Sequence, residues 1–188
     1  MALFVASVIF TLWLTGLTLD FESVLHAVPP LETGLLICAQ TFLHTGLFIT
    51  AHEAMHGNIS PNRTVNRTVG QMALWLYAGL DYQPLLVNHH QHHRYPATAQ
   101  DPDFCHYPSS RFWPWYFSFM QRYQSGKQIW RFLVWLTVFF LIVKLCSLPL
   151  SAVFYFGLLP LTLSSLAVSL GRQCSYVRSL TSVVCVVS

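Results

Sequence analysis

The chain has 188 residues, of which 54% are hydrophobic, 15% aromatic and only 9% charged. Ordinary soluble domains carry about 25% charged residues, so this composition argues against a soluble globular protein. Intrinsic disorder is excluded too, because disordered chains are polar and poor in aromatic residues. The formal net charge of +3 is small and the basic residues form no dense run, so we expect no nucleic-acid partner. The class that remains is a membrane protein.

The N-terminal part of the chain predicts a helical hairpin in the bilayer. Residues 1–19 and 33–51 are uncharged runs, each close to the roughly 20 mostly apolar residues that a membrane-spanning helix needs. Between them, Asp20, Glu32 and the pair Pro29-Pro30 predict a short acidic loop.

The rest of the chain predicts one short and two long apolar helices. Residues 69–80 end at Asp81 and are too few to span confidently, so we expect an interfacial or half-inserted helix. Residues 132–143 and 145–171 predict two further spans, with a break near 147–151. The expected fold class is therefore an all-α integral membrane protein with about four transmembrane helices and one interfacial or half-inserted helix.

The basic residues predict the orientation. They are concentrated between the second and third spans, and positively charged loops stay on the cytoplasmic side. We therefore expect the N-terminus and this central polar region, which contains most of the histidines, on the cytoplasmic face.

Two histidine clusters indicate a metal site. His52 and His56 are four residues apart where the second span ends, and His89, His92 and His93 have i, i+3, i+4 spacing. On a helix, each spacing places the imidazoles on one face. Imidazole suits iron, zinc and copper, and polar residues at membrane depth are costly, which favours a functional role. The lone histidines His26, His44 and His106 are expected to be structural.

The first cluster also matches a shorter pattern. His52-Glu53-Ala54-Met55-His56 reads as H-E-x-x-H, the zinc-protease signature in which the glutamate is the general base. An intramembrane zinc metalloprotease is therefore an alternative, although it gives the second cluster no role. It also needs a distant acidic ligand, and no Asp or Glu follows Asp103.

Four motifs resemble those of β-carotene ketolases, which belong to the wider membrane fatty-acid desaturase and hydroxylase superfamily. Their order and spacing match over roughly residues 42–119, and a weaker similarity of hydrophobic pattern extends to about 166. The motifs are T-A-H-E-A-M-H-G at 50–57, L-Y-A at 76–78, H-x-x-H-H at 89–93 and D-P-D-F at 101–104.

The resemblance implies a non-haem di-iron enzyme with its histidine clusters on the cytoplasmic or stromal face. Such an enzyme uses O2 and an external electron donor such as ferredoxin. It oxidises C4 of a β-ionone ring of β-carotene or a related carotenoid, by two hydroxylations and loss of water. By position, Glu53 and Asp101 would be the supporting carboxylates. The implied metal ligands are His52, His56, His89, His92 and His93.

The chain departs from the family at three places. Glu53 stands where the family usually has Asp, and Cys105 separates the D-P-D-F motif from His106. No histidine follows His106, whereas the family has another H-x-x-H-H beyond its fourth span. We therefore expect an incomplete desaturase/ketolase-like domain over 1–166, with fewer ligands than two irons need. A divergent tail over 167–188 would come from a changed reading frame, alternative splicing or a premature stop.

Three further functions stay open on the sequence. One is a related fatty-acyl desaturase or carotenoid hydroxylase, which product analysis distinguishes from a ketolase. Another is the zinc protease, and the last is a non-catalytic remnant that binds carotenoid.

Overall fold

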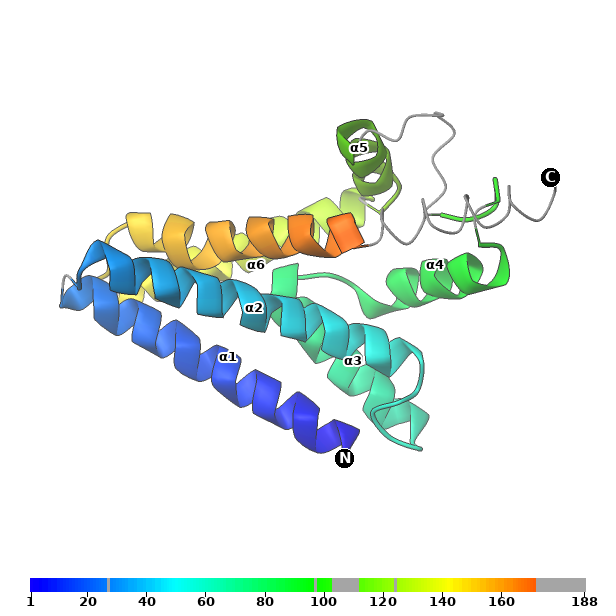
Figure 1. Ribbon diagram of the computed structural model, residues 1–188, viewed down its shortest axis with the longest axis horizontal. Helices are drawn as coiled ribbons and strands as arrows, with labels where there is room; N and C mark the ends of the chain where they lie inside the picture. The colour runs from blue at the N-terminus through cyan, green and yellow to red at the C-terminus, as the bar shows by residue number, and fades with distance from the viewer. Residues whose placement is uncertain (27, 97, 103–111, 124, 172–188) are drawn as a thin grey trace.

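The computed structural model describes residues 1–26, 28–96, 98–102, 112–123 and 125–171. Within these ranges every regular element is a helix (Figure 1), and four helices are long and apolar enough to cross a membrane, which confirms the predicted fold class. The four are α1, α2, α6 and the final helix Val153–Gly171. The elements are α1 (Ala2–Leu25), α2 (Pro30–Met55), α3 (Arg63–Ala78), α4 (Tyr82–Arg94), α5 (Phe112–Tyr123), α6 (Gly126–Leu145) and the π-helical start of the final helix, η1 (Val153–Leu158).

The α1–α2 hairpin has a shorter connection than the predicted acidic loop over 20–32. Helix α1 continues past the charge-free run to Leu25, and Asp20 is fully buried within it. Helix α2 begins at Pro30, whose ring fixes φ near the helical value and needs no N–H donor in the first turn. Acidic residues do not stop a helix, so the proline pair alone sets the start of α2.

Helix α3 is the shorter apolar segment and lies against α2. The Asn62 side chain caps it by accepting from the Thr64 amide at 2.8 Å. Small residues let the two helices approach closely: Ala54 of α2 and Ala73 of α3 are buried in one apolar cluster. As predicted, α3 is not among the helices that could span a membrane.

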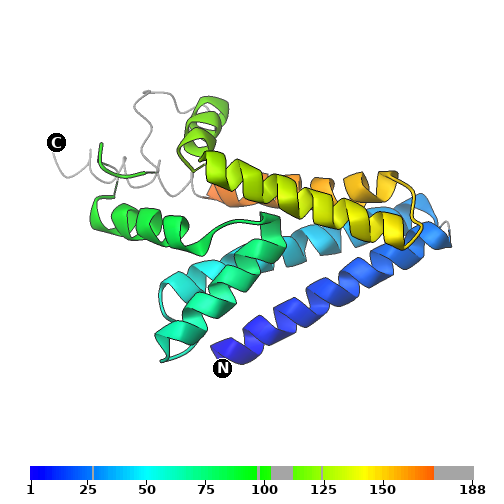
Figure 2. The same cartoon turned by 180° about the vertical axis from the view of Figure 1, so that it is seen from behind.

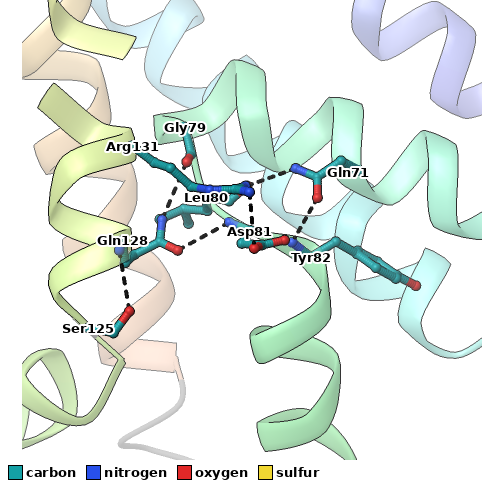
Figure 3. A network of polar contacts seen from close by, with 8 residues as sticks. All are labelled: Gln71, Gly79, Leu80, Asp81, Tyr82, Ser125, Gln128 and Arg131. Carbon is teal, nitrogen blue, oxygen red and sulfur yellow. Dashed lines mark hydrogen bonds and ion pairs between the residues drawn. The ribbon is translucent and has the colours of Figure 1, made fainter. Parts of the chain in front are cut away.

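A polar network fastens the α3–α4 connection to α6 (Figure 3). The Gln128 amide donates to the Gly79 carbonyl at 3.4 Å, and its oxygen accepts from the Asp81 amide at 3.2 Å. Arg131, one turn further along α6, forms an ion pair with Asp81 at 3.3 Å. These contacts fix where α4 begins relative to the spans.

Gln71 holds the same connection from α3. Its amide donates to the Leu80 carbonyl at 3.0 Å, and its oxygen accepts from the Tyr82 amide at 3.1 Å (Figure 3). The connection therefore has hydrogen-bond partners on both sides, and α4 leaves it in a defined direction.

Replacing Gly79 by alanine is expected to destabilise the protein by about 2–4 kcal/mol. Gly79 has a φ of +65°, and an added Cβ would lie 2.8 Å from the Arg131 carbonyl oxygen and 2.9 Å from Trp135 Cβ. Gly126→Ala is the matched control, because nothing lies within 4 Å of its Cβ position. Denaturation in detergent measures both variants, and equal stabilities would contradict the prediction.

Helix α6 and the final helix form the other long hairpin. The predicted break is confirmed: α6 ends at Leu145, and Ser147 adopts a positive φ of 57° before the chain turns back at residue 151. Figures 1 and 2 show this turn at the same end of the molecule as the α1–α2 connection, with α4 at the opposite end.

Candidate metal centre

The two histidine clusters meet where the last turn of α2 lies beside α4. His52 is in that turn and His56 is the residue that ends the helix. His89 lies in α4 and is buried, whereas His56 is exposed, so the group opens toward one side. The network around Gly79 that sets the start of α4 therefore also decides where His89 lies.

Three imidazoles form the centre of the cluster. The ring centroids of His52, His56 and His89 are 4.6–4.7 Å apart in every pairing. The Nε2 atoms of His56 and His89 are 3.1 Å apart. One nitrogen from each of the three rings lies within 4.8 Å of the others, a spacing that suits a shared metal ion.

The other two predicted ligands lie at the edge of this group. The His93 ring is 4.9 Å from His56 and 4.6 Å from His89, which makes it a fourth member. The His92 ring is 5.6 Å from that of His93. His90 is exposed, and its ring lies 6.3 Å from that of its neighbour His89.

Both predicted carboxylates contact histidine rings. The fully buried Asp101 accepts from His92 Nδ1 at 3.0 and 3.1 Å. Glu53 lies 3.4 Å from His52 Nδ1 and accepts from the Asn58 amide at 2.7 Å. A carboxylate is an acceptor, so it places the ring proton on Nδ1 and leaves the Nε2 lone pair for a metal. The contacts of Asp101 and Glu53 therefore suit a role in orienting the rings of His92 and His52.

The donor set fits a transition-metal ion. Neutral imidazoles are good ligands for iron and zinc, and the described site contains no thiolate that an oxidising reaction would consume. Partial burial and, next, the neighbouring His56 lower the pKa of His93, which favours the neutral ring that metal binding requires. Because His89 and His93 join His52 and His56, the arrangement contains more imidazoles than the H-E-x-x-H pattern uses.

An apolar cavity of about 570 Å³ begins at the histidines. His52, His89 and His92 form part of its wall, and most of the remainder is apolar. Helices α2, α3, α6 and the final helix contribute Phe48, Met55, Leu74, Phe132 and Leu161, among others. A cavity of this kind accommodates a hydrocarbon ligand beside the metal ligands.

Sequence reasoning missed the polar residues of this cavity. The hydroxyl groups of Tyr77, Tyr116 and Ser165 line it, from three different elements. In the sequence these residues stand out only as hydroxyl-bearing residues in otherwise apolar helices. Many membrane helices contain such residues. Asp103, Cys105 and His106 lie outside the described residues, as does 172–188.

Comparison with known proteins places this geometry in a family. The family model for fatty acid desaturases matches residues 27–177, which include both histidine clusters and all four residues of the group His52, His56, His89 and His93. The chain belongs to the fatty acid desaturase family.

The relatives of this desaturase-family chain include carotenoid ketolases. A β-carotene ketolase of Paracoccus sp. (strain PC1) is 43% identical over 120 residues, which cover 63% of this chain and 45% of that protein. A β-carotene 4-ketolase of Haematococcus lacustris is 41% identical over 129 residues, covering 62% and 40%. A zeaxanthin 4-ketolase of Chlamydomonas reinhardtii is 43% identical over 96 residues, covering 50% and 21%.

The chain thus matches less than half the length of each of these relatives. No solved structure shows a significant match to it.

Proposed function

We propose that this chain carries the catalytic centre of an oxygen-dependent carotenoid 4-ketolase, with β-carotene or a related carotenoid as the substrate. The observation that carries the proposal is the histidine cluster at the wall of an apolar cavity of about 570 Å³. The 41–43% identity to ketolases of bacteria and algae supports the choice of reaction.

Iron is the metal that we propose for the histidine cluster. His52, His56, His89 and His93 would hold it, and His92, whose Nδ1 faces Asp101, would add a further ligand. When bound, non-haem iron supplies the activation of O2 for C–H hydroxylation. Two irons are expected for the family, and the five histidines of the two clusters supply fewer ligands than two irons need.

The cavity residues would bind the substrate and exclude water. Phe48 and Met55 lie on the same face of α2 as His52, so a ring in the cavity packs against apolar groups while its edge faces the imidazoles. Each hydroxylation consumes one O2, two electrons and two protons, and releases one water. A second hydroxylation at the same carbon gives a geminal diol, which loses water to leave the ketone.

We propose that the histidine end faces the cytoplasm or stroma. Arg63 and Arg67 begin α3 and Arg94 ends α4, so the basic residues surround this end, as expected for a cytoplasmic face. The electrons would come from a donor protein such as ferredoxin, which would dock on the exposed side of His56 and His93.

We also propose that the ketolase-like part covers 1–166 and that 167–188 diverges from it. The final helix continues through residue 166 to Gly171, and the family match extends to 177. The proposed boundary at 166 therefore falls inside a helix and inside the region that the family model matches.

Expression of this exact chain in bacteria that make β-carotene tests the proposed function. We expect echinenone and canthaxanthin in the membranes, measured by chromatography, and their loss in a His52→Ala variant. Unchanged β-carotene in membranes that contain the chain with bound iron would contradict a ketolase. A hydroxylated or desaturated product would instead support a related enzyme of the family.

A further inference from the structure

Four hydroxyl groups gather at the wall of the apolar cavity. We call Tyr77, Tyr116, Ser164 and Ser165 the hydroxyl cluster; they come from α3, α5 and the final helix. The oxygens of Tyr116 and Ser165 are 3.2 Å apart, and those of Tyr77 and Ser164 are 3.5 Å apart. Tyr77, Tyr116 and Ser165 line the cavity, and Ser164 is buried behind it.

The hydroxyl cluster has more protons to donate than it has hydrogen bonds between its own members. In the Tyr116–Ser165 pair only one hydroxyl donates to the other, and the second proton has no other acceptor among the described residues. Behind them, Thr45 donates to the Thr41 carbonyl at 3.0 Å, and its hydroxyl oxygen lies 2.9 Å from that of Ser164.

Tyr77 keeps its proton at every physiological pH. Burial in an apolar setting raises the pKa of Tyr77 to about 12, and the hydroxyl of Ser164 opposes this only in part. Tyr77 accepts from the Ser164 hydroxyl at 3.5 Å, a long contact, so the proton of Tyr77 is not used in that hydrogen bond. Tyr77 is thus a second hydroxyl that can donate to a ligand.

Two other polar residues of the cavity wall are already engaged. The Thr162 hydroxyl donates to the Leu158 carbonyl and lies 3.1 Å from that of Leu159. The amide of Gln128 is held by Gly79 and Asp81, as described above. In contrast, the hydroxyl cluster has hydrogen-bond donors at the wall of an apolar cavity. Such donors are costly to bury unless the oxygen of a ligand accepts from them.

About the width of one aromatic ring separates the hydroxyl cluster from the histidines. The Tyr77 ring packs on Phe48 with centroids 5.5 Å apart, and Phe48 precedes His52 by four residues, a rise of about 6 Å on α2. Both His52 and Tyr77 line the same cavity. A ring whose carbon faces the imidazoles therefore brings its neighbouring substituents to the hydroxyl groups.

We propose that the hydroxyl cluster binds a hydroxyl oxygen carried by the substrate ring beside the carbon that is oxidised. It thereby makes the protein prefer hydroxylated rings, as in zeaxanthin, over the unsubstituted rings of β-carotene. The identity of the ligand as a carotenoid rests on the proposed function. A hydrogen bond of this kind raises the affinity for the hydroxylated ring about five- to tenfold relative to the unsubstituted ring.

Pigment retention tests the proposal without depending on catalysis. Purified protein in detergent is incubated with equal amounts of zeaxanthin and β-carotene, and the bound pigments are extracted and separated. We expect an excess of bound zeaxanthin, which falls about five- to tenfold relative to β-carotene in Tyr116→Phe and in Ser165→Ala. The double variant should lose no more than either single one, because the two hydroxyls act as a pair.

Two controls match these substitutions. Tyr155→Phe removes a hydroxyl from an exposed tyrosine of η1, and Thr162→Val removes a hydroxyl that is engaged by the backbone. Neither should change the retention ratio.

Three results would overturn the proposal: no preference in the unmodified protein, an equal loss of both pigments in the variants, or retention of neither pigment. A chain that keeps the preference but forms no ketone would contradict only the proposed function.

Discussion

Replacing His89 by alanine is expected to lower the iron affinity by at least about 100-fold, the largest effect of any single substitution in the cluster. Losses of 10–100-fold are typical when only a residue that supports a ligand is removed. His89 is itself a candidate ligand, it is buried, and its ring contacts those of His52, His56 and His93. Its removal therefore takes the central donor from the group.

His90→Ala is the matched control for this substitution. His90 is the next residue of α4 and is exposed, and its ring lies further from that of His89 than the rings of His52, His56 and His93 do. Iron bound per chain after anaerobic loading, together with the helical circular dichroism signal, separates loss of metal from loss of fold. Equal iron contents in the two variants would show that the cluster does not hold the metal.

Changing Asp101 to asparagine is expected to weaken iron binding by about 10–100-fold while the helices stay folded. The buried carboxylate accepts from His92 Nδ1 with both oxygens. An amide keeps only one acceptor oxygen, and its NH2 group cannot accept from the ring. His92 then loses the fixed tautomer that leaves Nε2 for a metal.

Glu22→Gln makes the matching carboxylate-to-amide change away from the metal centre. Glu22 lies in α1 and is exposed, 3.9 Å from the exposed His26. Its iron affinity should equal that of the unmodified protein. Titration with iron under anaerobic conditions compares the variants, and an Asp101→Asn affinity equal to that of Glu22→Gln would refute the role of Asp101.

The membrane spans were predictable because they depend on local composition. A run of apolar residues near 20 long is helical in a bilayer whatever it packs against. The same reasoning went wrong at Asp20, where charge was taken as the end of the first span. The helix nevertheless continues to Leu25 with the Asp20 side chain fully buried, and a single sequence does not reveal which charges are buried.

The histidine site was predictable in part. Spacing alone placed His52 with His56, and His89 with His92 and His93, on single helix faces. It could not show that His89 and His93 meet the α2 pair, since that depends on how α4 leaves its connection. The contact of Asp101 with His92 is equally a product of the fold.

The sequence by itself therefore determined the class of protein, the four spans and the kind of atoms available to a metal, because each is set by residues near one another in the chain. The tertiary structure alone decided the cavity and the hydroxyl cluster. Tyr77, Tyr116 and Ser165 are far apart in the chain and carry no common motif. They share one wall only because α3, α5 and the final helix converge beside α2, and such convergence is a matter of packing between helices.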